Sequence, residues 1–187
     1  MLISRIFPYL PSATHGRPGH PAHLYKGQGG GRLDNPSHYH VWYLSDDPCG
    51  AIGETFGNLD TWSNAMFSFP GLIGSRRALA TYTLPDGLSI LDLDDARNLL
   101  DRGMRPTQVV ERNRSATQSW ALRIFNERND AGQRMWQGVS WWSLHRPQWK
   151  LMGLWGSITP SVVSVEQLDT KHPAVVDAAN TLRKVII

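Results

Sequence analysis

The strand-like residues of this chain lie in short, separate segments, and this limits the folds open to it. Six segments of five to eight residues have the aromatic and β-branched composition of short strands. They are residues 40–44, 77–84, 88–93, 138–142, 151–155 and 162–168. No internal repeat relates these segments, so a solenoid or a propeller is not indicated. The pattern predicts a sheet assembled from short strands.

Helical patterns lie between the predicted strands. The first follows the start signal Asp47-Pro48, and the longest has an apolar stripe that includes Trp120 and Ile124. The three predicted helices are residues 49–59, 94–102 and 115–129. Strands with interspersed helices predict an α+β fold, with a mixed or antiparallel β core and surrounding helices.

Two further expectations concern organisation. A length of 187 residues suits one domain spanning 1–187, with a core of its own. The turn sequence Pro85-Asp86-Gly87 separates strands 77–84 and 88–93, so we expect these two strands to pair as a hairpin.

Residues 11–31 are rich in Gly, Pro, His and Ser and end in three consecutive glycines. Because glycine is conformationally loose and proline lacks an N–H donor, this segment predicts a surface loop without regular structure. It is either a functional loop or a plain connector.

The composition excludes several classes of protein. Apolar residues make up 41% and charged residues 19%, which is typical of a folded globule. The single cysteine, Cys49, can form neither an intramolecular disulfide nor a thiolate cluster, which favours a reducing cytoplasm. Arg5 and Pro8 interrupt the apolar N-terminus, so we expect no signal peptide, and no segment approaches the roughly 18 apolar residues of a membrane helix.

Charge and histidines give weaker indications. The formal net charge of +3 comes from scattered basic residues, which suits a nucleotide as well as a nucleic acid. His20, His23, His38 and His40 lie close in sequence, but no acidic or cysteine partner completes a recognised metal site. We therefore expect loop histidines and no metal.

The most informative stretch combines three elements: a Gly-Gly-Arg segment ending at Arg32, a strand containing Tyr43, and a helix carrying Glu54. These three residues lie at intervals of eleven residues. In this order and spacing the stretch resembles the RES domain, a family named for an arginine, a glutamate and a serine. Four further motifs continue the resemblance over nearly the whole chain, at residues 80–85, 91–94, 117–121 and 138–143.

The resemblance implies a fold similar to that of ADP-ribosyltransferase toxins and a cleft that binds NAD⁺ as substrate. It implies cleavage of the nicotinamide-ribose bond, by a glycohydrolase or phosphorylase reaction or by transfer of ADP-ribose to a target protein. It also implies a toxin that is neutralised by an antitoxin, commonly an Xre-type helix-turn-helix protein that covers the cleft.

Carried over by position, the resemblance assigns catalytic roles to Arg32, Tyr43, Glu54 and Ser143, and NAD⁺ binding to Arg5, Arg32 and Tyr43. The sequence departs from the family in two places. Leu33-Asp34 replaces the usual Trp-Asn, which puts the packing of the loop in question. Ser4 replaces the usual aromatic, which makes Arg5 the least secure assignment.

The chemistry of these residue types suits the implied reaction. A carboxylate such as Glu54 stabilises the positive charge that develops on the ribose as neutral nicotinamide leaves. Arg32, with Arg5 as a second clamp, suits the pyrophosphate, and the preceding glycines would bring backbone N–H groups to its oxygens. The Tyr43 ring can stack on nicotinamide, its hydroxyl can fix a ribose or amide group, and Ser143 can donate a hydrogen bond to the substrate.

Each residue also has a structural interpretation. Arg32 can be a solvated loop residue, Tyr43 a core residue, Glu54 part of a wet helix face and Ser143 a loop cap. The alternative to an enzyme is a non-catalytic module that binds a nucleotide or a nucleic acid, and the basic composition and the departures at Leu33-Asp34 motivate it.

Overall fold

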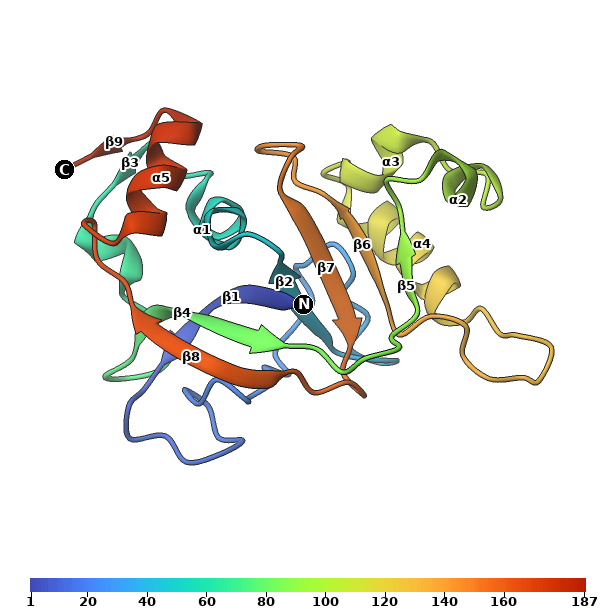
Figure 1. Cartoon of the computed structure of the whole chain (residues 1–187), viewed down its shortest axis with the longest axis horizontal. Helices are drawn as coiled ribbons and strands as arrows, with labels where there is room; N and C mark the ends of the chain where they lie inside the picture. Colours follow the sequence, from blue (N-terminus) through green and yellow to red (C-terminus); the bar gives the residue numbers. More distant parts are fainter.

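A computed structural model describes residues 1–187. Its centre is a seven-stranded mixed sheet with the strand order β5-β6-β7-β2-β1-β4-β8 (Figure 1). Neighbouring strands are antiparallel except for β5 and β6, which are parallel. The strands are β1 Leu2–Tyr9, β2 Val41–Ser45, β4 Arg76–Thr83, β5 Ile90–Asp92, β6 Gly138–Trp142, β7 Lys150–Trp155 and β8 Ser161–Gln167.

Five α-helices accompany the sheet, together with a short 3-10 turn, Asn64–Phe67, and a two-stranded parallel sheet. The helices are α1 Pro48–Phe56, α2 Ala96–Leu100, α3 Pro106–Val110, α4 Arg114–Phe125 and α5 Pro173–Leu182. The small sheet pairs β3 Thr61–Trp62 with β9 Val185–Ile186. None of the helices is long and apolar enough to cross a membrane.

The predicted α+β class with a mixed sheet is confirmed, and all six predicted strands are present within two residues of their expected bounds. The three predicted helices are also present, although α4 ends four residues earlier than expected, at Phe125. Strand β1, helices α3 and α5, and the short strands β3 and β9 were not predicted from the sequence. Strand β1 contains Pro8, but beyond Ser4 it pairs with β4 alone, and a strand paired on one side tolerates proline.

The expected hairpin of β4 and β5 is wrong. Strand β4 is flanked on one edge by β1 and on the other by β8, so neither edge is left for β5. Strand β5 pairs in parallel with β6 at the opposite end of the sheet. Residues 84–89 are therefore a crossing connection, although their Pro-Asp-Gly sequence is typical of a tight turn.

Strands β1 and β2 barely pair, and this divides the sheet. Their register contains the single pair Ser4 and Ser45, whereas β1 pairs with β4 along its whole length. The two halves, β5-β6-β7-β2 and β1-β4-β8, run in clearly different directions (Figure 1). An apolar cluster that includes Phe7, Trp42 and Tyr82 packs between the halves on one face of the sheet.

The other face carries two helical groups. Helix α4 packs its predicted stripe, including Trp120 and Ile124, onto β2, β6 and β7, and α1 with α5 packs beside β1 and β4. Figure 1 shows α1 and α5 on one side of the β6-β7 loop and α2, α3 and α4 on the other. The two helical groups thus lie on either side of the place where β1 and β2 separate.

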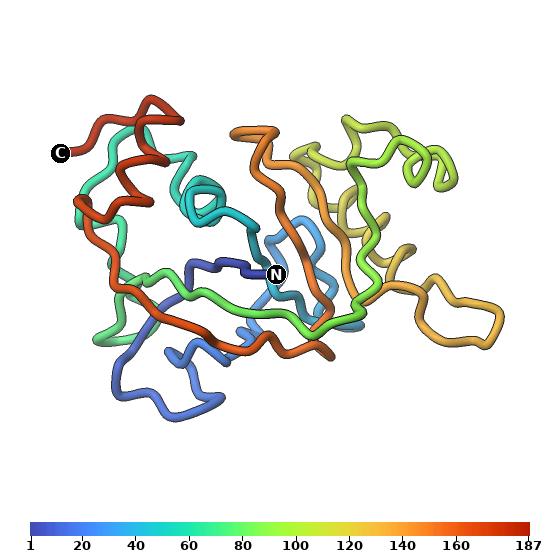
Figure 2. The backbone as a smooth tube through the Cα atoms, in the orientation of Figure 1, coloured from blue at the N-terminus to red at the C-terminus, as the bar shows by residue number.

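Residues 11–31 form turns and irregular chain, as predicted (Figure 2). They are nevertheless attached to the sheet, because the buried hydroxyl of Tyr82 donates to the carbonyl of Pro21 at 2.9 Å. The Gln28 side chain both donates to and accepts from the backbone of Val41, each at 2.7 Å, as a further strand would.

Replacing Gly138 with alanine tests the packing of β6 on β7. An added Cβ would meet the backbone carbonyl oxygen of Gly153, which cannot move without disturbing the pairing of the strands. We expect Gly138→Ala to lower the free energy of unfolding by about 1–3 kcal/mol, the usual cost of overpacking, in urea denaturation. Gly29→Ala is the control, because a Cβ there meets no atom within 4 Å. Equal losses in both variants would contradict this account.

Candidate functional site

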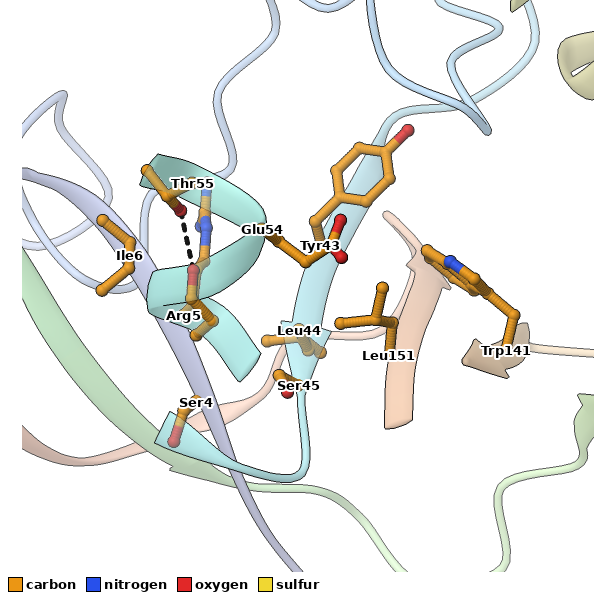
Figure 3. Close-up of a pocket in the computed structure, with 11 residues that line it drawn as sticks. Ser4, Arg5, Ile6, Tyr43, Leu44, Ser45, Glu54, Thr55, Trp141 and Leu151 are labelled. Carbon is orange, nitrogen blue, oxygen red and sulfur yellow. Dashed lines mark hydrogen bonds between the residues drawn. The ribbon is translucent and has the colours of Figure 1, made fainter. Parts of the chain in front are cut away.

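A cleft of about 230 Å³ lies where β1 and β2 separate, beneath α1 (Figure 3). Its wall and floor combine apolar side chains with a few polar groups. The lining residues are Ser4, Arg5, Ile6, Tyr43, Leu44, Ser45, Ala51, Glu54, Thr55, Trp141 and Leu151. Three of the five predicted site residues, Arg5, Tyr43 and Glu54, therefore line one cleft, whereas Arg32 and Ser143 are not part of its wall.

Helix α1 presents Glu54 to this cleft because its neighbours are fixed in the core. Asp47 caps the helix by accepting from Cys49 N at 2.7 Å, and Ile52 and Phe56 are buried in the α1-α5 cluster. With those two positions turned inward, Glu54 is left exposed. Figure 3 shows its carboxylate directed from the helix toward the side of the cleft that Tyr43 forms.

Ser143 lies behind Glu54 in the loop between β6 and β7. Its fully buried hydroxyl donates to Glu54 Oε1 at 2.5 Å and accepts from the N–H groups of His145, at 3.0 Å, and Arg146, at 3.4 Å. The serine thus caps the loop, which is one of the two roles considered from the sequence. Its hydroxyl proton is donated to the glutamate, so the other role, a hydrogen bond to the substrate, does not fit this arrangement. Ser140, the other serine of the 138–143 motif, does not contact Glu54 in this way; its hydroxyl donates to Asp92 at 3.2 Å.

Two glycines of α1 allow this loop to reach Glu54. A Cβ at Gly53 would collide with the Trp149 ring, and a Cβ at Gly50 would collide with Ser45 Oγ and crowd Trp149. The buried indole therefore lies directly on the helix backbone. Because Ser143 N donates to Trp149 O at 2.9 Å, the same contact fixes the distance between Ser143 and Glu54.

The Tyr43 hydroxyl binds protein groups. It donates to Asp34 Oδ1 at 2.7 Å and accepts from Leu33 N at 2.9 Å. Burial, and then the negative charge of Asp34, raises the pKa of Tyr43 well above its ordinary value, so the hydroxyl remains a donor. The ring lines the cleft, but the role first considered for the hydroxyl, fixing a ribose or amide group, does not fit these bonds.

Asp34 also binds two of the three backbone N–H groups of the glycine run. Its Oδ2 accepts from Gly29 N at 2.8 Å and from Gly31 N at 2.6 Å. The expectation that these N–H groups would bind phosphate does not fit this arrangement. Only Gly31 needs to be glycine for reasons of space, because a Cβ there would collide with the Tyr43 hydroxyl.

Gln118 of α4 completes the attachment of this loop and was not singled out in the sequence. Its Nε2 donates to the carbonyls of Gly29, at 3.1 Å, and Gly31, at 2.9 Å. The Gln118 carbonyl in turn accepts from Asn35 Nδ2 at 3.0 Å. Its place in the 117–121 motif was the available signal, but only the folded chain shows that it bonds a segment more than 80 residues away.

Arg32 projects from this anchored loop toward the end of α3. Its Nη1 donates to the carbonyls of Val109, at 2.6 Å, and Glu111, at 2.9 Å, and Nη2 donates to Val110 O at 3.4 Å. Burial, followed by the charge of Arg114, lowers the pKa of Arg32, while the charge of Glu54 acts in the opposite direction. The guanidinium is thus near enough to both groups for their charges to act on it, and two of its five N–H donors have no protein acceptor.

Arg5 is engaged differently. Its guanidinium lies 4.8 Å from the centre of the Trp42 ring, which belongs to the cluster on the opposite face of the sheet. Its Nη1 donates to His23 O at 3.3 Å. These contacts attach the 11–31 loop to the sheet, and they do not favour the role of a second pyrophosphate clamp.

Comparison with known proteins identifies the family. The family model of the RES domain matches residues 7–177. The chain belongs to the RES domain family. The fold is similar to that of a chain in the crystal structure of the M. tuberculosis MbcT-MbcA toxin-antitoxin complex, with a TM-score of 0.57 and 14% identity over 98% of this chain and 89% of that chain. A comparison with curated proteins finds no match.

In this RES domain, Asp34 stands where the family usually has asparagine. Asparagine has one side-chain oxygen, whereas the Asp34 carboxylate accepts three hydrogen bonds with two oxygens. Leu33 replaces the usual tryptophan and is fully buried against Gly153, at which a Cβ would collide with Leu33 Cδ1. Both departures are therefore accommodated by local packing.

The Tyr43 hydroxyl can be tested without changing the ring. Tyr43→Phe leaves Asp34, which is 4% exposed, and Leu33 N each without one hydrogen bond. We expect the free energy of unfolding to fall by about 1–3 kcal/mol, the cost of unsatisfied buried polar groups, in urea denaturation. Tyr25→Phe, at an exposed tyrosine, is the control and should change little. An unchanged stability in Tyr43→Phe would show that the hydroxyl does not hold the loop.

Proposed function

We propose that this RES domain is an NAD⁺-consuming, toxin-like enzyme that cleaves the nicotinamide-ribose bond. The observation that carries the proposal is the Glu54 carboxylate, which is exposed to a cleft lined by two aromatic rings and held from behind by the buried Ser143 hydroxyl. A carboxylate oriented in this way is suited to stabilise positive charge on a bound sugar.

The reaction needs little acid catalysis. When the C–N bond to nicotinamide breaks, its electron pair leaves with the ring, which departs neutral, and positive charge develops on the ribose. Glu54 stabilises that charge and orients the acceptor, which forms the new bond to the same carbon. Ser143 is a positioning residue, because its buried hydroxyl holds the Glu54 carboxylate, accepts from the N–H groups of His145 and Arg146, and is not part of the cleft wall.

The size of the cleft suggests how the substrate lies. At about 230 Å³ it is smaller than the 300–1,000 Å³ of typical ligand pockets, so it suits nicotinamide and its ribose and not a whole dinucleotide. The half-buried Tyr43 offers a ring against which nicotinamide can pack, while the buried Trp141 lines the cleft beside it. The rest of NAD⁺ must extend beyond the cleft.

Arg32 and Arg114 are the cations we assign to the pyrophosphate. Arg32 retains two N–H donors without protein acceptors, and Arg114, at the start of α4, is exposed and near enough to act on the pKa of Arg32. Neither arginine forms a salt bridge with an acidic residue. Two neighbouring cations without an acidic partner favour an anion between them. In this proposal Arg114 replaces Arg5 as the second clamp.

The partner and setting follow from the family and from the related structure, which is a toxin-antitoxin complex. We propose a cognate antitoxin, of the Xre helix-turn-helix type, that covers the cleft in the cytoplasm. The acceptor of ADP-ribose is water, phosphate or a target protein. Incubation with NAD⁺ and phosphate, followed by mass spectrometry of the products, distinguishes these three.

Glu54→Gln tests the central claim. The amide oxygen can still accept from Ser143, so the loop stays in place while the negative charge is lost. We expect NAD⁺ turnover by the purified protein to fall at least ~100-fold, comparable to the loss of one preorganised electrostatic group. Asp60→Asn, at an exposed acid, is the control. Unchanged turnover in Glu54→Gln would contradict the mechanism.

Salt-dependent oligonucleotide binding without NAD⁺ loss in the unmodified protein would favour the non-catalytic alternative.

Arg114→Gln tests the pyrophosphate assignment. Loss of one charge-assisted contact of about 1.5 kcal/mol raises KM for NAD⁺ roughly 10-fold, with a smaller change in kcat, because the contact lies away from the reacting carbon. Steady-state kinetics of Arg112→Gln provide the matched control, since Arg112 is an exposed arginine two residues away. Equal KM values in the two variants would remove Arg114 from the site.

A further inference from the structure

A second cavity lies at the other end of β2 and β7 from Glu54. Its volume is about 340 Å³, which exceeds that of the cleft and lies within the range of small-molecule sites. Five separate segments form it. Its lining residues are Leu24, Lys26, His38, Tyr39, His40, Phe125, Arg134, Trp155, Gly156 and Ser157.

The lining is basic and contains no carboxylate. Lys26 and Arg134 are cations at neutral pH, and His38 and His40 add ring nitrogens that can form hydrogen bonds. Of the four histidines considered for a metal site in the sequence, His38 and His40 thus lie here, while His20 and His23 line a different cavity. No group of three potential metal-ligating side chains is formed anywhere in the structure.

The floor is a rigid aromatic cluster. The ring of Tyr39 lies 4.3 Å from that of Phe125 and 4.7 Å from that of Trp155, measured between centroids. All three rings are at most 8% exposed, so they support the cavity but offer little surface to a stacked base. Arg134 lies on this floor, with its guanidinium carbon 3.8 Å from the Phe125 centroid and its Nε donating to Phe125 O at 3.2 Å.

The other segments that line the cavity are also held in place. Gln28 bonds twice to Val41, which fixes the chain that carries Lys26 beside the start of β2. Gly156 N donates to His40 O at 2.8 Å, and a Cβ at Gly156 would crowd Leu24 and this same carbonyl. The cavity is therefore formed by packed segments.

The positive charge in this cavity has no counterpart in the protein. The three salt bridges of the structure involve other cations, Arg102, Lys150 and His172. Burial, and then the charge of Arg128, lowers the pKa of Arg134, and no acidic group offsets either effect. Arg128 adds to the excess, since only backbone carbonyls, of Phe125 and Glu127, accept its hydrogen bonds.

We propose that this cavity binds the phosphate group of a small molecule of mononucleotide size. Arg134 and Lys26 supply the cations that bind the phosphate, and His40, which directly precedes β2, supplies a further ring nitrogen. The buried rings disfavour base stacking, which separates this site from a single-stranded nucleic-acid surface. The proposal is independent of NAD⁺ cleavage, because it shares no residue with the Glu54 cleft.

Titration of ¹⁵N-labelled protein with AMP, followed by NMR, tests this assignment. We expect saturable shifts at the amides of His40 and Gly156, while shifts at Gly53 would report the cleft separately. Arg134→Gln and Lys26→Gln should each weaken binding at His40 and Gly156 at least ~10-fold, and Arg17→Gln, in an exposed loop, should not. Because Arg134 also packs on Phe125, the exposed Lys26 is the variant that removes charge without touching the floor.

Further arms identify the ligand. Inorganic phosphate should compete with AMP for the shifts at Gly156, since the phosphate is the recognised group. Absence of saturable shifts there, or equal affinity in Lys26→Gln and Arg17→Gln, would overturn the site. Affinity for oligothymidylate that rises with length, without competition by AMP, would assign the cavity to nucleic acid and overturn the small-molecule assignment.

Discussion

Strands β1 and β2 pair through Ser4 and Ser45 alone, and the arrangement of the rest of the molecule depends on that separation. Beyond this point β1 continues with β4 and β2 continues with β7, so the two halves of the sheet take different directions. Side chains that would cover one another in a continuous sheet instead line a cleft. Helix α1, which directly follows β2, crosses this opening and brings Glu54 to it.

The site around this opening is held by hydrogen bonds between buried polar groups. Ser143 orients Glu54 from one side, while Asp34 binds the Tyr43 hydroxyl and the backbone of the glycine run on the other. Buried polar groups of this kind are costly unless each has a partner, so such networks fix one geometry. The anchored loop carries Arg32, whose position is thus set by the hydrogen bonds of Asp34 and Gln118.

The sequence predicted the strands better than their partners. Local composition marks strands because β-branched and aromatic residues favour an extended chain, whereas the pairing of β5 with β6 depends on contacts almost 50 residues apart. Helix α5 was missed despite a proline at its start and an apolar pattern over Val175, Ala178 and Ala179, which packs on α1. The departures at Leu33 and Asp34 could not be judged from sequence, because only the folded chain brings them against their partners, Gly153 and Tyr43.

By itself the sequence determined the α+β class, the irregular 11–31 segment, and, through the order and spacing of its motifs, membership of the RES domain family. These properties depend on local backbone preference and on residue order, which the chain carries before it folds. Only the tertiary structure decided which donors and acceptors are already used. In the folded chain the Arg5 guanidinium lies over the Trp42 ring, and Glu54 faces the cleft. The Asp34 carboxylate accepts from the Tyr43 hydroxyl and from two of the glycine N–H groups. Hydrogen-bond partners distant in sequence are set by packing, and packing is a property of the whole fold.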